Sequence, residues 1–222
     1  MTPALLRAVH RLVALPWVYD LTQRLTGAAF VRRRVSGVIG RQSGEGVVLD
    51  VGGGTAVNRR YWPSTWMMVC LDNDKQKFSR PAERSIVRVL GDATSVPLRD
   101  GAADAVICTC VTHHLDAEQL HAALHEASRV LAQEGRLVLL DAIESRRNLM
   151  SRMLWSLDRG AHPRAASFLQ QAIAEHFDVE RVETFTVLHR YLLIVARRRA
   201  QDAGSMPPRS ASSLRAARRC RA

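Results

Sequence analysis

The sequence predicts an α/β fold, in which a mostly parallel sheet has helices on both faces. Two observations carry this prediction. Short apolar runs recur along the middle of the chain, at Gly46–Val51, Trp66–Leu71, Ile86–Leu90, Asp104–Val111 and Arg136–Leu140. Helical patterns alternate with these runs, and strands that alternate with helices pair in parallel and bury both faces of their sheet.

The clearest helix is predicted over Ala117–Leu131, where apolar residues recur at helical spacing. Asp116 precedes it and Gln119 follows three residues later, which is the spacing of a capping box. Two more strand-like runs, Phe177–Phe185 and Arg190–Ala196, follow each other without a helix between them. They predict an antiparallel hairpin at the C-terminal edge of the sheet.

The two ends of the chain differ from the main domain, which we predict over residues 46–198. Residues 1–45 predict an N-terminal helical arm or lid, which either packs on the domain or covers a site or a membrane surface. The formal net charge is +11. The segment from Arg197 to the end contains eight arginines and a single acidic residue, Asp202. Residues 199–222 are therefore predicted as a disordered, solvated basic tail, with contact to nucleic acid or anionic lipid as the alternative.

Cysteine usage and hydropathy indicate a cytoplasmic protein. Three of the four cysteines lie in apolar runs, where a thiol packs as a small hydrophobe, so no disulfide framework is expected. Charged residues interrupt the apolar stretch near the start, which argues against a secretory signal. No stretch is long and apolar enough to predict a membrane span.

The segment with the most chemical information is Val47–Ala56, where a buried strand enters a turn of three consecutive glycines and then a helix start. Glycines allow backbone conformations that other residues avoid and let a ligand approach the main chain. Ligands of open α/β sheets bind beyond the carboxyl ends of the strands. Asp72 comes 22 residues after Asp50, at the end of the next predicted strand. A carboxylate there can accept the ribose hydroxyls of an adenosine cofactor.

The type of adenosine cofactor follows from what the loop lacks. A dinucleotide fingerprint ends in glycine or alanine, whereas Val57 stands at that position. Asp50 at the loop entrance fits poorly beside a pyrophosphate but suits a cationic ligand. S-adenosyl-L-methionine carries an ammonium and a sulfonium and no phosphate, so it is the favoured cofactor.

With these residues, the chain resembles the class I S-adenosylmethionine-dependent methyltransferases of the small-molecule type over about Gly46 to Arg197. The segments that carry the likeness are Leu49–Thr55 (glycine motif), Cys70–Asp74 (ribose segment), Gly91–Leu98 (adenine edge), Asp104–Cys110 (fourth strand), and Ser128–Leu131 with Gly135–Leu140 (fifth helix and strand). Two positions depart from the family pattern, since Ala56 and Glu134 stand where glycine is usual. The resemblance implies a Rossmann-like, seven-stranded sheet with a reversed last strand.

The resemblance also implies which residues bind the cofactor. They are Asp50, Gly52, Gly53, Gly54, Asp72, Asn73, Asp92, Ala93, Cys108 and Thr109. Among them, Asp92 is expected near the adenine amino group.

Methyl transfer needs a general base only if the nucleophile carries a proton that must leave early. His113 and His114 follow the fourth strand and Asp141 ends the fifth, so these three are the catalytic candidates. An imidazole titrates near pH ~6.5, which suits a base. As alternatives, one histidine (His114 in the first place) sets the loop by bonding backbone, and Asp141 is a helix cap or a salt-bridge partner.

His121 and His125 lie one helical turn apart, a spacing that can hold a metal ion. The sequence offers no third ligand at a useful spacing. We therefore expect a solvated helix face and no metal.

The acceptor site is predicted from Tyr19, Arg159 and Arg164. Tyr19 lies near the turn of the arm and can close over the cofactor. The two arginines lie in a segment, Ser156–Arg164, that interrupts two helical patterns, and they can pair with an acidic acceptor. A turn with helix caps is the alternative for the arginines. The position after the fourth strand lacks an Asn/Asp-Pro-Pro-aromatic motif, and the chain lacks a Pro-Cys nucleophile, so a small-molecule acceptor is favoured over nucleic acid.

Two other functions stay open on the sequence alone. One is a non-catalytic, cofactor-binding member of the same fold. The other is an NAD(P)-dependent oxidoreductase, against which Val57 and the long segment before the first strand argue. The sequence does not indicate an oligomeric state.

Overall fold

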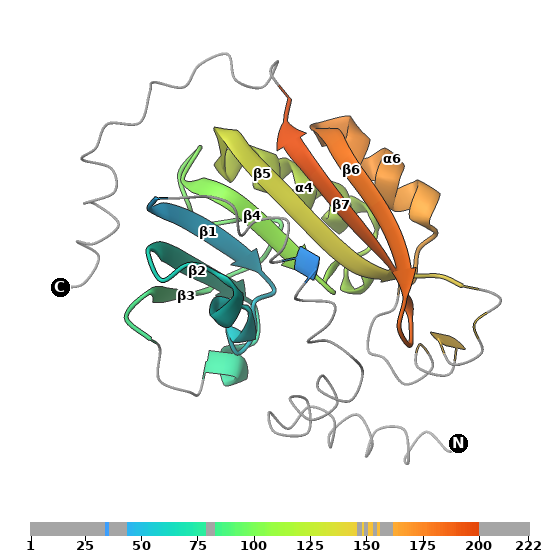
Figure 1. Ribbon diagram of the computed structural model, residues 1–222, viewed down its shortest axis with the longest axis horizontal. Coiled ribbons are helices and arrows are strands. Elements are labelled where there is room, and N and C mark those ends of the chain that lie inside the picture. The colour runs from blue at the N-terminus through green and yellow to red at the C-terminus, as the bar shows by residue number, and fades with distance from the viewer. Residues whose placement is uncertain are drawn as a thin grey trace.

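The computed structural model describes residues 34–35, 44–78, 83–145, 148, 151–152, 155 and 162–199. Within these ranges a seven-stranded sheet has the order β3-β2-β1-β4-β5-β7-β6 (Figure 1). Its strands are β1 (Gly46–Val51), β2 (Trp66–Asp72), β3 (Ile86–Leu90), β4 (Ala103–Thr109), β5 (Leu131–Ile143), β6 (Phe177–Thr186) and β7 (Arg190–Arg198). The helices are α4 (Ala117–Val130) and α6 (Ala166–His176), with the 3₁₀ helices η1 (Val57–Tyr61), η2 (Lys75–Phe78) and η3 (Thr112–His114).

The strand directions confirm the predicted mixture of parallel and antiparallel pairing. β1 pairs in parallel with β2 and β4, and β3 and β5 extend this parallel sheet on either side. β7 runs antiparallel to both β5 and β6, which gives the predicted C-terminal hairpin. All six residues of β1 are buried, as expected for a central strand covered on both faces.

Each face of the sheet has its own apolar core. α4 and α6 pack side by side on one face, where Leu120 and Ile173 join the strand residues Leu49 and Leu139 (Figure 1). On the other face, Ile107 and Leu140 pack with Trp62, Trp66 and Val35. Of the predicted arm, the structure describes residues 34–35 and 44–45; Arg34 and Val35 are helical, and the buried Val35 packs on the sheet. None of the helices in the described ranges has the length and apolarity that crossing a bilayer requires.

Several strand boundaries differ from the predicted ones, and the start of β5 and the end of β4 have a clear physical cause. β5 begins at Leu131, where α4 ends, and not at Arg136, because Leu131 already pairs with Ala103 of β4. The exposed polar residues that follow Leu131 hid this part of the strand from the apolar pattern. β4 ends at Thr109 because Cys110 has a φ of +57°, in the left-handed region that L-residues avoid.

The helix after the glycine turn is also shorter than a typical α-helix. It is the 3₁₀ helix η1, and its N-cap Ala56 has a left-handed φ of 60°. Glycine is the residue favoured at such a backbone position. This places a methyl-bearing residue where the resemblance expects glycine.

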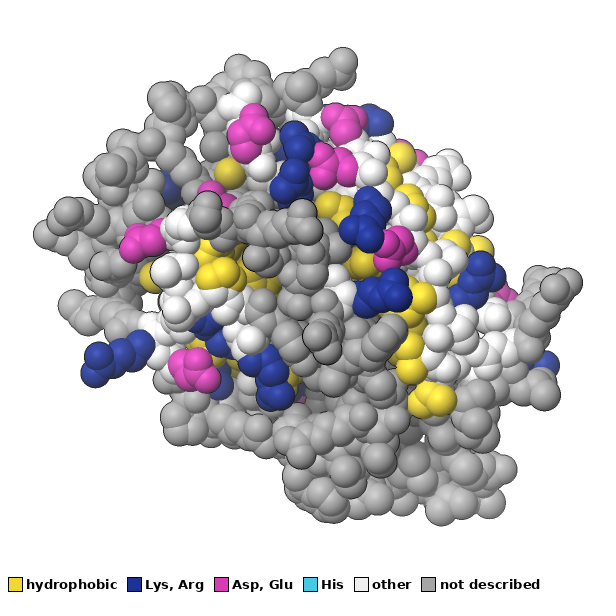
Figure 2. All heavy atoms as spheres, viewed as in Figure 1, with side chains coloured by type: hydrophobic (Ala, Val, Ile, Leu, Met, Phe, Trp, Pro, Cys, Tyr) yellow, Lys and Arg dark blue, Asp and Glu magenta, His cyan; other side chains and the backbone are white. Residues whose placement is uncertain are grey.

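Charged side chains of both signs mix on the hairpin edge of the sheet. Figure 2 shows Lys/Arg and Asp/Glu side chains interspersed on the described part of this face. Glu180 of β6 pairs with Arg136 of β5 at 3.1 Å and with Arg197 of β7, and Glu183 pairs with Arg34 at 3.2 Å. Cross-strand pairs of opposite charge support the register of the sheet.

The capping box at the start of α4 yields a test of local stability. The Asp116 side chain accepts a hydrogen bond from the amide of Gln119 at 2.8 Å, and the Gln119 side chain accepts one from the amide of Asp116 at 2.9 Å. We expect Asp116→Ala to lower the free energy of unfolding by about 1 kcal/mol, and Asp116→Asn, which keeps an acceptor, by roughly a few tenths. Urea denaturation followed by circular dichroism measures both; equal losses would contradict the capping role.

Candidate functional site

The β1–η1 loop is built from glycines at which a side chain would be obstructed. Gly52 and Gly54 have φ of +66° and +56°, in the region that favours glycine. A Cβ on Gly52 would overlap Cγ2 of Val111, and one on Gly53 would lie 2.6 Å from Sγ of Cys70. The loop therefore presents bare backbone beyond the carboxyl end of β1.

Asp72, the last residue of β2, turns its buried carboxylate toward this loop. Its Oδ2 accepts a hydrogen bond from the amide of Gly54 at 2.9 Å, and its Oδ1 accepts one from the amide of Asp74 at 2.9 Å. Lys77 Nζ lies 3.5 Å from Oδ2, and Asn73 is exposed. Because each carboxylate oxygen can accept more than one bond, Asp72 remains able to receive ribose hydroxyls beside the glycine loop.

Asp50 lies beneath the loop. Its side chain is fully buried, and its two oxygens lie 3.3 and 3.1 Å from Nδ2 of Asn58, which donates to them. The same Nδ2 is 3.4 Å from Oγ1 of Thr109 at the end of β4. Asp50 and Asn58 thus support the loop from inside, and direct contact of Asp50 with a cationic ligand stays a prediction.

The loop after β3 holds the predicted adenine-edge residues. Oδ1 of Asp92 accepts hydrogen bonds from the amide and the hydroxyl of Thr94 at 2.8 and 2.7 Å, which closes a tight turn around Ala93. Asp92 is exposed and Ala93 is half-buried. The turn lies next to the ribose acid, because the amide of Gly91 donates to the carbonyl of Asp72 at 3.1 Å.

Two residues of α4 hold this loop in place. Glu126 accepts a hydrogen bond from the amide of Val96 at 2.7 Å, and Arg129 donates to the carbonyls of Val96 and Leu98 at 2.9 and 2.8 Å. The Arg129 guanidinium bonds Glu126 at 2.7 Å, which lowers the pKa of Glu126 and raises that of Arg129. Glu126 and Arg129 are therefore both charged at neutral pH, and together they hold the loop after β3.

The cysteines near the loop are neutral thiols at physiological pH. Burial, helped by the nearby acids Asp50 and Asp72, raises the pKa of Cys70 to about 12. Burial also raises the pKa of Cys108 well above its ordinary value. Both pack as small apolar groups, which fits the sequence-based expectation for them.

η3 places the two candidate histidines in different environments. His113 is buried, and its Nδ1 lies 2.6 Å from Oδ1 of Asp141. His114 is exposed, with its ring centroid 4.2 Å from that of His113. Oδ2 of Asp141 accepts hydrogen bonds from the amide and the hydroxyl of Thr112 at 2.7 and 2.5 Å. His113 therefore fixes the loop through its side chain, a role that the sequence suggested first for His114.

The Asp141 carboxylate is ionised despite its burial. Burial acts to raise its pKa, but attraction to His113 and hydrogen bonds from His113, Thr112 and the amide of Ala142 outweigh it, so the pKa lies below the ordinary value. An ionised Asp141 holds the proton of His113 on Nδ1, which makes Nε2 the atom that accepts a proton. This geometry favours the salt-bridge alternative for Asp141 over its role as a base.

Arg164 belongs to the same loop. Its Nη1 donates to the carbonyl of Thr112 and its Nη2 donates to that of Leu115 at 2.5 Å. Burial lowers the pKa of this guanidinium, although the nearby Asp141 and Asp116 act to raise it. These bonds favour a loop-setting role over the expected contact with an acidic acceptor. Tyr19 and Arg159 lie outside the described residues.

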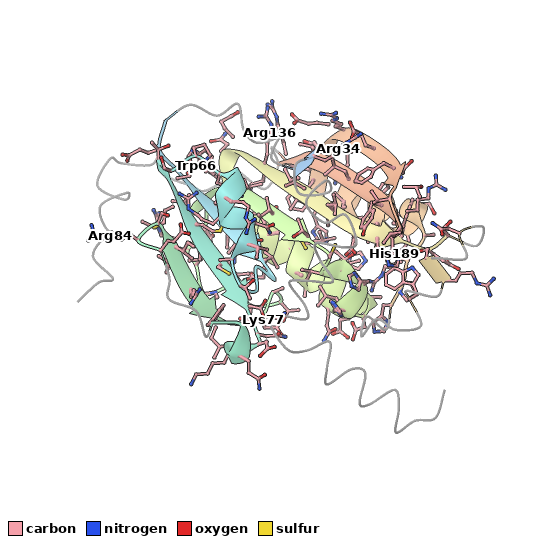
Figure 3. All side chains as sticks on the ribbon, turned by 60° about the horizontal axis from the view of Figure 1, so that its bottom comes forward. Arg34, Trp66, Lys77, Arg84, Arg136 and His189 are labelled. Atoms are coloured by element: carbon pink, nitrogen blue, oxygen red, sulfur yellow. The ribbon has the colours of Figure 1, made fainter. Side chains whose placement is uncertain are left out.

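Aromatic rings continue from His113 across the carboxyl end of the sheet. The His113 centroid lies 5.2 Å from that of Trp155, which lies 5.1 Å from that of His189. A cavity of about 350 Å³ opens here, and its described lining is Glu144, Ser145, Arg152 and Trp155. In Figure 3, His189 and Lys77 lie toward the lower edge of the sheet, and Trp66 and Arg136 toward the upper edge. This cavity and the carboxylate of Asp72 thus belong to the same end of the sheet.

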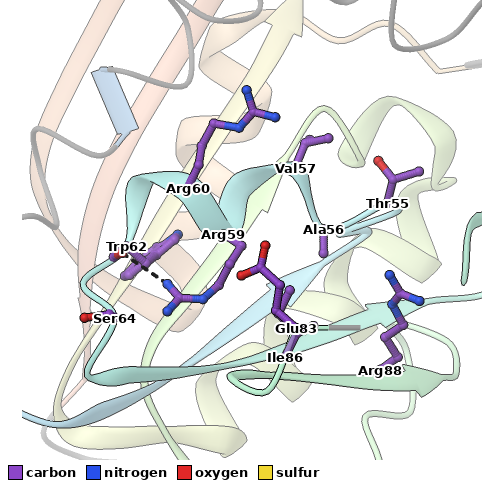
Figure 4. A pocket seen from close by; sticks show the side chains of 10 residues that line it. All are labelled: Thr55, Ala56, Val57, Arg59, Arg60, Trp62, Ser64, Glu83, Ile86 and Arg88. Carbon is purple, nitrogen blue, oxygen red and sulfur yellow. Dashed lines mark hydrogen bonds between the residues drawn. The ribbon is translucent and has the colours of Figure 1, made fainter. Parts of the chain in front are cut away.

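A second cavity, of about 420 Å³, lies between η1 and the start of β3. Arg59, Arg60, Glu83 and Arg88 contribute charged groups to its lining. Arg59 points toward Trp62, whose carbonyl accepts its Nη1 at 3.1 Å, while Arg60 points away from Glu83 (Figure 4). The lining of this second cavity includes neither Asp72 nor His113, so the cavity is distinct from the site at the strand ends.

Comparison with known proteins extends this picture. Residues 49–139 match the model of a family described as a methyltransferase domain. The fold resembles that of Burkholderia thailandensis 1,6-didemethyltoxoflavin-N1-methyltransferase, solved with 1,6-didemethyltoxoflavin and S-adenosylhomocysteine, at 16% identity over 89% of this chain and 91% of that chain, with a TM-score of 0.62. No curated protein matches the sequence.

Two further solved structures share the fold. Geranyl diphosphate methyltransferase, in complex with geranyl diphosphate and sinefungin, is 12% identical over 77% of this chain and 78% of that chain, with a TM-score of 0.63. The [4+2]-cyclase SpnF is 17% identical over 75% and 81%, with a TM-score of 0.59.

The sheet order, the reversed β7 and these likenesses define a Rossmann-like methyltransferase fold. The matched domain and these likenesses support an S-adenosylmethionine-dependent methyltransferase. The residues fit the cofactor, because bare backbone at Gly52–Gly54 adjoins the inward-turned carboxylate of Asp72. NAD(P)-dependent hydride transfer is set aside by the same match.

Three residues of the site escaped the sequence analysis. Asn58 and Glu126 act on loops 8 and 30 residues away in the chain, and neither belongs to a recognisable motif. For Thr112, the only signal in the sequence was its position directly before the candidate His113.

The loop geometry predicts that Gly52→Ala impairs both folding and cofactor binding. The left-handed φ costs an alanine about 1–2 kcal/mol, and its Cβ overlaps Val111. We expect at least about a tenfold weaker Kd for S-adenosylhomocysteine by calorimetry, since each tenfold is about 1.4 kcal/mol. Gly44→Ala is the matched control, because Gly44 also has a positive φ, +106°, but open space around it. It should lower stability and leave the Kd unchanged; a Gly52→Ala protein that binds normally would contradict this role for the loop.

The lowered pKa of Asp141 predicts acid-sensitive stability. The unfolded chain binds a proton on this carboxylate more readily than the folded one, so its stabilisation is present at neutral pH and is lost from roughly pH 5 downward. Asp141→Asn lacks this titration, so the difference in unfolding free energy between wild type and variant should shrink as the pH falls. Urea denaturation at a series of pH values measures it. A difference that stays constant down to the acid limit would show that Asp141 does not stabilise the fold as an anion.

Proposed function

We propose that this enzyme transfers the methyl group to a small-molecule acceptor that binds beside His113. The observation that carries the proposal is the cavity of about 350 Å³ next to Trp155, at the strand ends that also hold the cofactor loop. Small-molecule sites typically have volumes of about 300–1,000 Å³ and apolar or aromatic walls with a few polar groups. The aromatic rings of Trp155 and His189 and the polar Glu144, Ser145 and Arg152 fit this description.

The charge distribution supports a small acceptor over a nucleic acid. On the hairpin edge of the described chain, arginines are paired with Glu180 and Glu183. A nucleic-acid surface instead gathers unpaired basic residues along one face. Two of the structurally similar proteins were solved with small molecules of this kind, 1,6-didemethyltoxoflavin and geranyl diphosphate. A reducing, cytoplasmic setting fits Cys70, Cys108 and Cys110, which are all thiols.

In the proposed reaction the chain positions the acceptor and manages its proton. Bound S-adenosylmethionine supplies a methyl group that its sulfonium activates for in-line displacement. The glycine loop, Asp72 and the turn at Asp92 would hold this cofactor. The walls around Trp155 would align the acceptor nucleophile, which is the main contribution of such an enzyme to the rate.

His113 is the proposed proton acceptor where the nucleophile carries a proton. Asp141 keeps the His113 proton on Nδ1, so Nε2 takes the proton that leaves the nucleophile of the methyl acceptor. The Asp141 carboxylate then stabilises the positively charged imidazolium of His113. The bonds from Thr112 to Asp141 and from Arg164 to the loop fix the ring in this orientation. Asp141, Thr112 and Arg164 thus act as positioning residues. His114, exposed on the same turn, is the alternative base.

His113→Asn tests this role, because the asparagine amide can still donate to Asp141 but has no Nε2. With S-adenosylmethionine labelled in the methyl group and a cell extract as acceptor source, we expect a new labelled compound in the fraction that passes an ultrafilter, separated from S-adenosylmethionine by chromatography and absent without the enzyme. His113→Asn should lower the rate about 10²-fold or more and keep the Kd for S-adenosylhomocysteine.

The same experiment with His114→Asn separates the two histidines. A larger loss in that variant would transfer the role of base to His114. Label that stays with protein or nucleic acid would contradict a small-molecule acceptor. Tight cofactor binding without any labelled product would favour the non-catalytic alternative.

A further inference from the structure

Three histidines and one glutamate gather where α4 and α6 pack together on one face of the sheet (Figure 1). His121 and His125 lie one turn apart on α4, and Glu175 and His176 end α6. Nδ1 of His121 is 3.3 Å from Oε2 of Glu175. The ring centroid of His176 lies 5.8 Å from that of His121 and 6.4 Å from that of His125. The cofactor loop and the acceptor cavity use none of these four residues.

We propose that His121, Glu175 and His176 bind a divalent transition-metal ion, with Zn²⁺ as the expected occupant, and that the ion links α6 to α4. One donor atom of each residue lies within 4.8 Å of the others. Donor atoms about 2.0–2.2 Å from a tetrahedral zinc ion are roughly 3.3–3.6 Å apart, so each needs to move by on the order of 1 Å. The side chains of His121 and Glu175 are 38% and 52% exposed, so rotamer changes can supply this shift and an ion can enter from solvent.

The donor set selects the class of metal. Imidazole nitrogens favour Zn²⁺, Ni²⁺, Cu²⁺ and Co²⁺, whereas Mg²⁺ and Ca²⁺ prefer sites built from oxygen alone. Two imidazoles and one carboxylate form a common three-ligand zinc set, with a water or a further side chain as the fourth ligand. His125 is placed to be that further ligand, because it lies one turn after His121 on the same helix face.

The fold supplies the ligands that the sequence spacing lacks. Glu175 follows His121 by 54 residues, and only the packing of α6 against α4 brings them together. The helix face expected to be merely solvated therefore gains a carboxylate and a third imidazole from another element. An ion held between the two helices would add a cross-link to the apolar contact of Leu120 and Ile173.

Acids slightly outnumber bases around the cluster. Glu126 Oε1 lies 4.0 Å from Nδ1 of His125, and Arg129 bonds Glu126 at 2.7 Å. Arg199 donates to the carbonyls of Ala174 and Glu175 at the end of α6, and it pairs with Asp178 at 3.5 Å. The three acids Glu126, Glu175 and Asp178 thus outnumber the two arginines, which favours a cation.

The test is a titration of the full-length protein, first treated with a chelator, with CoCl₂ and then with ZnCl₂. We expect one ion per chain, visible Co²⁺ absorption bands without thiolate charge transfer, and a Tm that rises with Zn²⁺. His121→Gln and His176→Gln should each weaken binding by about tenfold or more and abolish the rise in Tm. His162→Gln is the matched control, since His162 lies in the described chain outside the cluster, and it should bind as the wild type does.

The Kd for S-adenosylhomocysteine checks that each variant is folded, and it should be the same in all of them. The proposal is overturned if the chain binds no stoichiometric ion or if both cluster variants bind as tightly as the wild type. It is also overturned if Co²⁺ shows the near-ultraviolet bands of cysteine ligation. None of these outcomes depends on which acceptor the enzyme methylates.

Discussion

The cofactor half of the site depends on the contact between the end of β2 and the glycine loop that leaves β1. Segments leaving neighbouring parallel strands can touch through their backbones only where no side chain intervenes, and Gly52–Gly54 provide that space. The buried carboxylate of Asp72 closes the contact by accepting the amide hydrogen of Gly54. A buried charge is tolerated only when it is bonded in this way. The loop and the acid therefore determine each other's position.

On the other side of the sheet centre, a second buried carboxylate fixes the turn after β4 in the same way. Asp141 at the end of β5 is buried and ionised, and it organises the turn after β4 through Thr112 and His113. The two carboxylates flank the point between β1 and β4 where the strand order reverses. Open α/β sheets bind ligands at this switch point. The glycine loop thus lies on one side of this switch point, and the turn that carries His113 lies on the other.

How much the sequence could predict follows from the range of each interaction. The capping box of Asp116 and Gln119 was predictable because it spans three residues, and the parallel sheet with its C-terminal hairpin followed from the spacing of the apolar runs. The supports of the site were not, because Glu126 and Arg164 act on segments 30 and 49 residues away. A local pattern carries no information on such contacts. The burial of Asp50 was also hidden, since an acid before a glycine turn gives the same pattern whether it faces ligand or core.

Cys110 gives the turn after β4 a strained backbone. Its left-handed φ costs a residue with a side chain about 1–2 kcal/mol, and Ala56 at the end of the glycine loop carries the same penalty, whereas Gly52 and Gly54 do not. The hydrogen bonds of Thr112 and His113 to Asp141 hold the strained turn in place. Backbone strain of this kind persists only where the surrounding contacts fix the chain. Loss of one of these bonds would therefore release the backbone that carries His113.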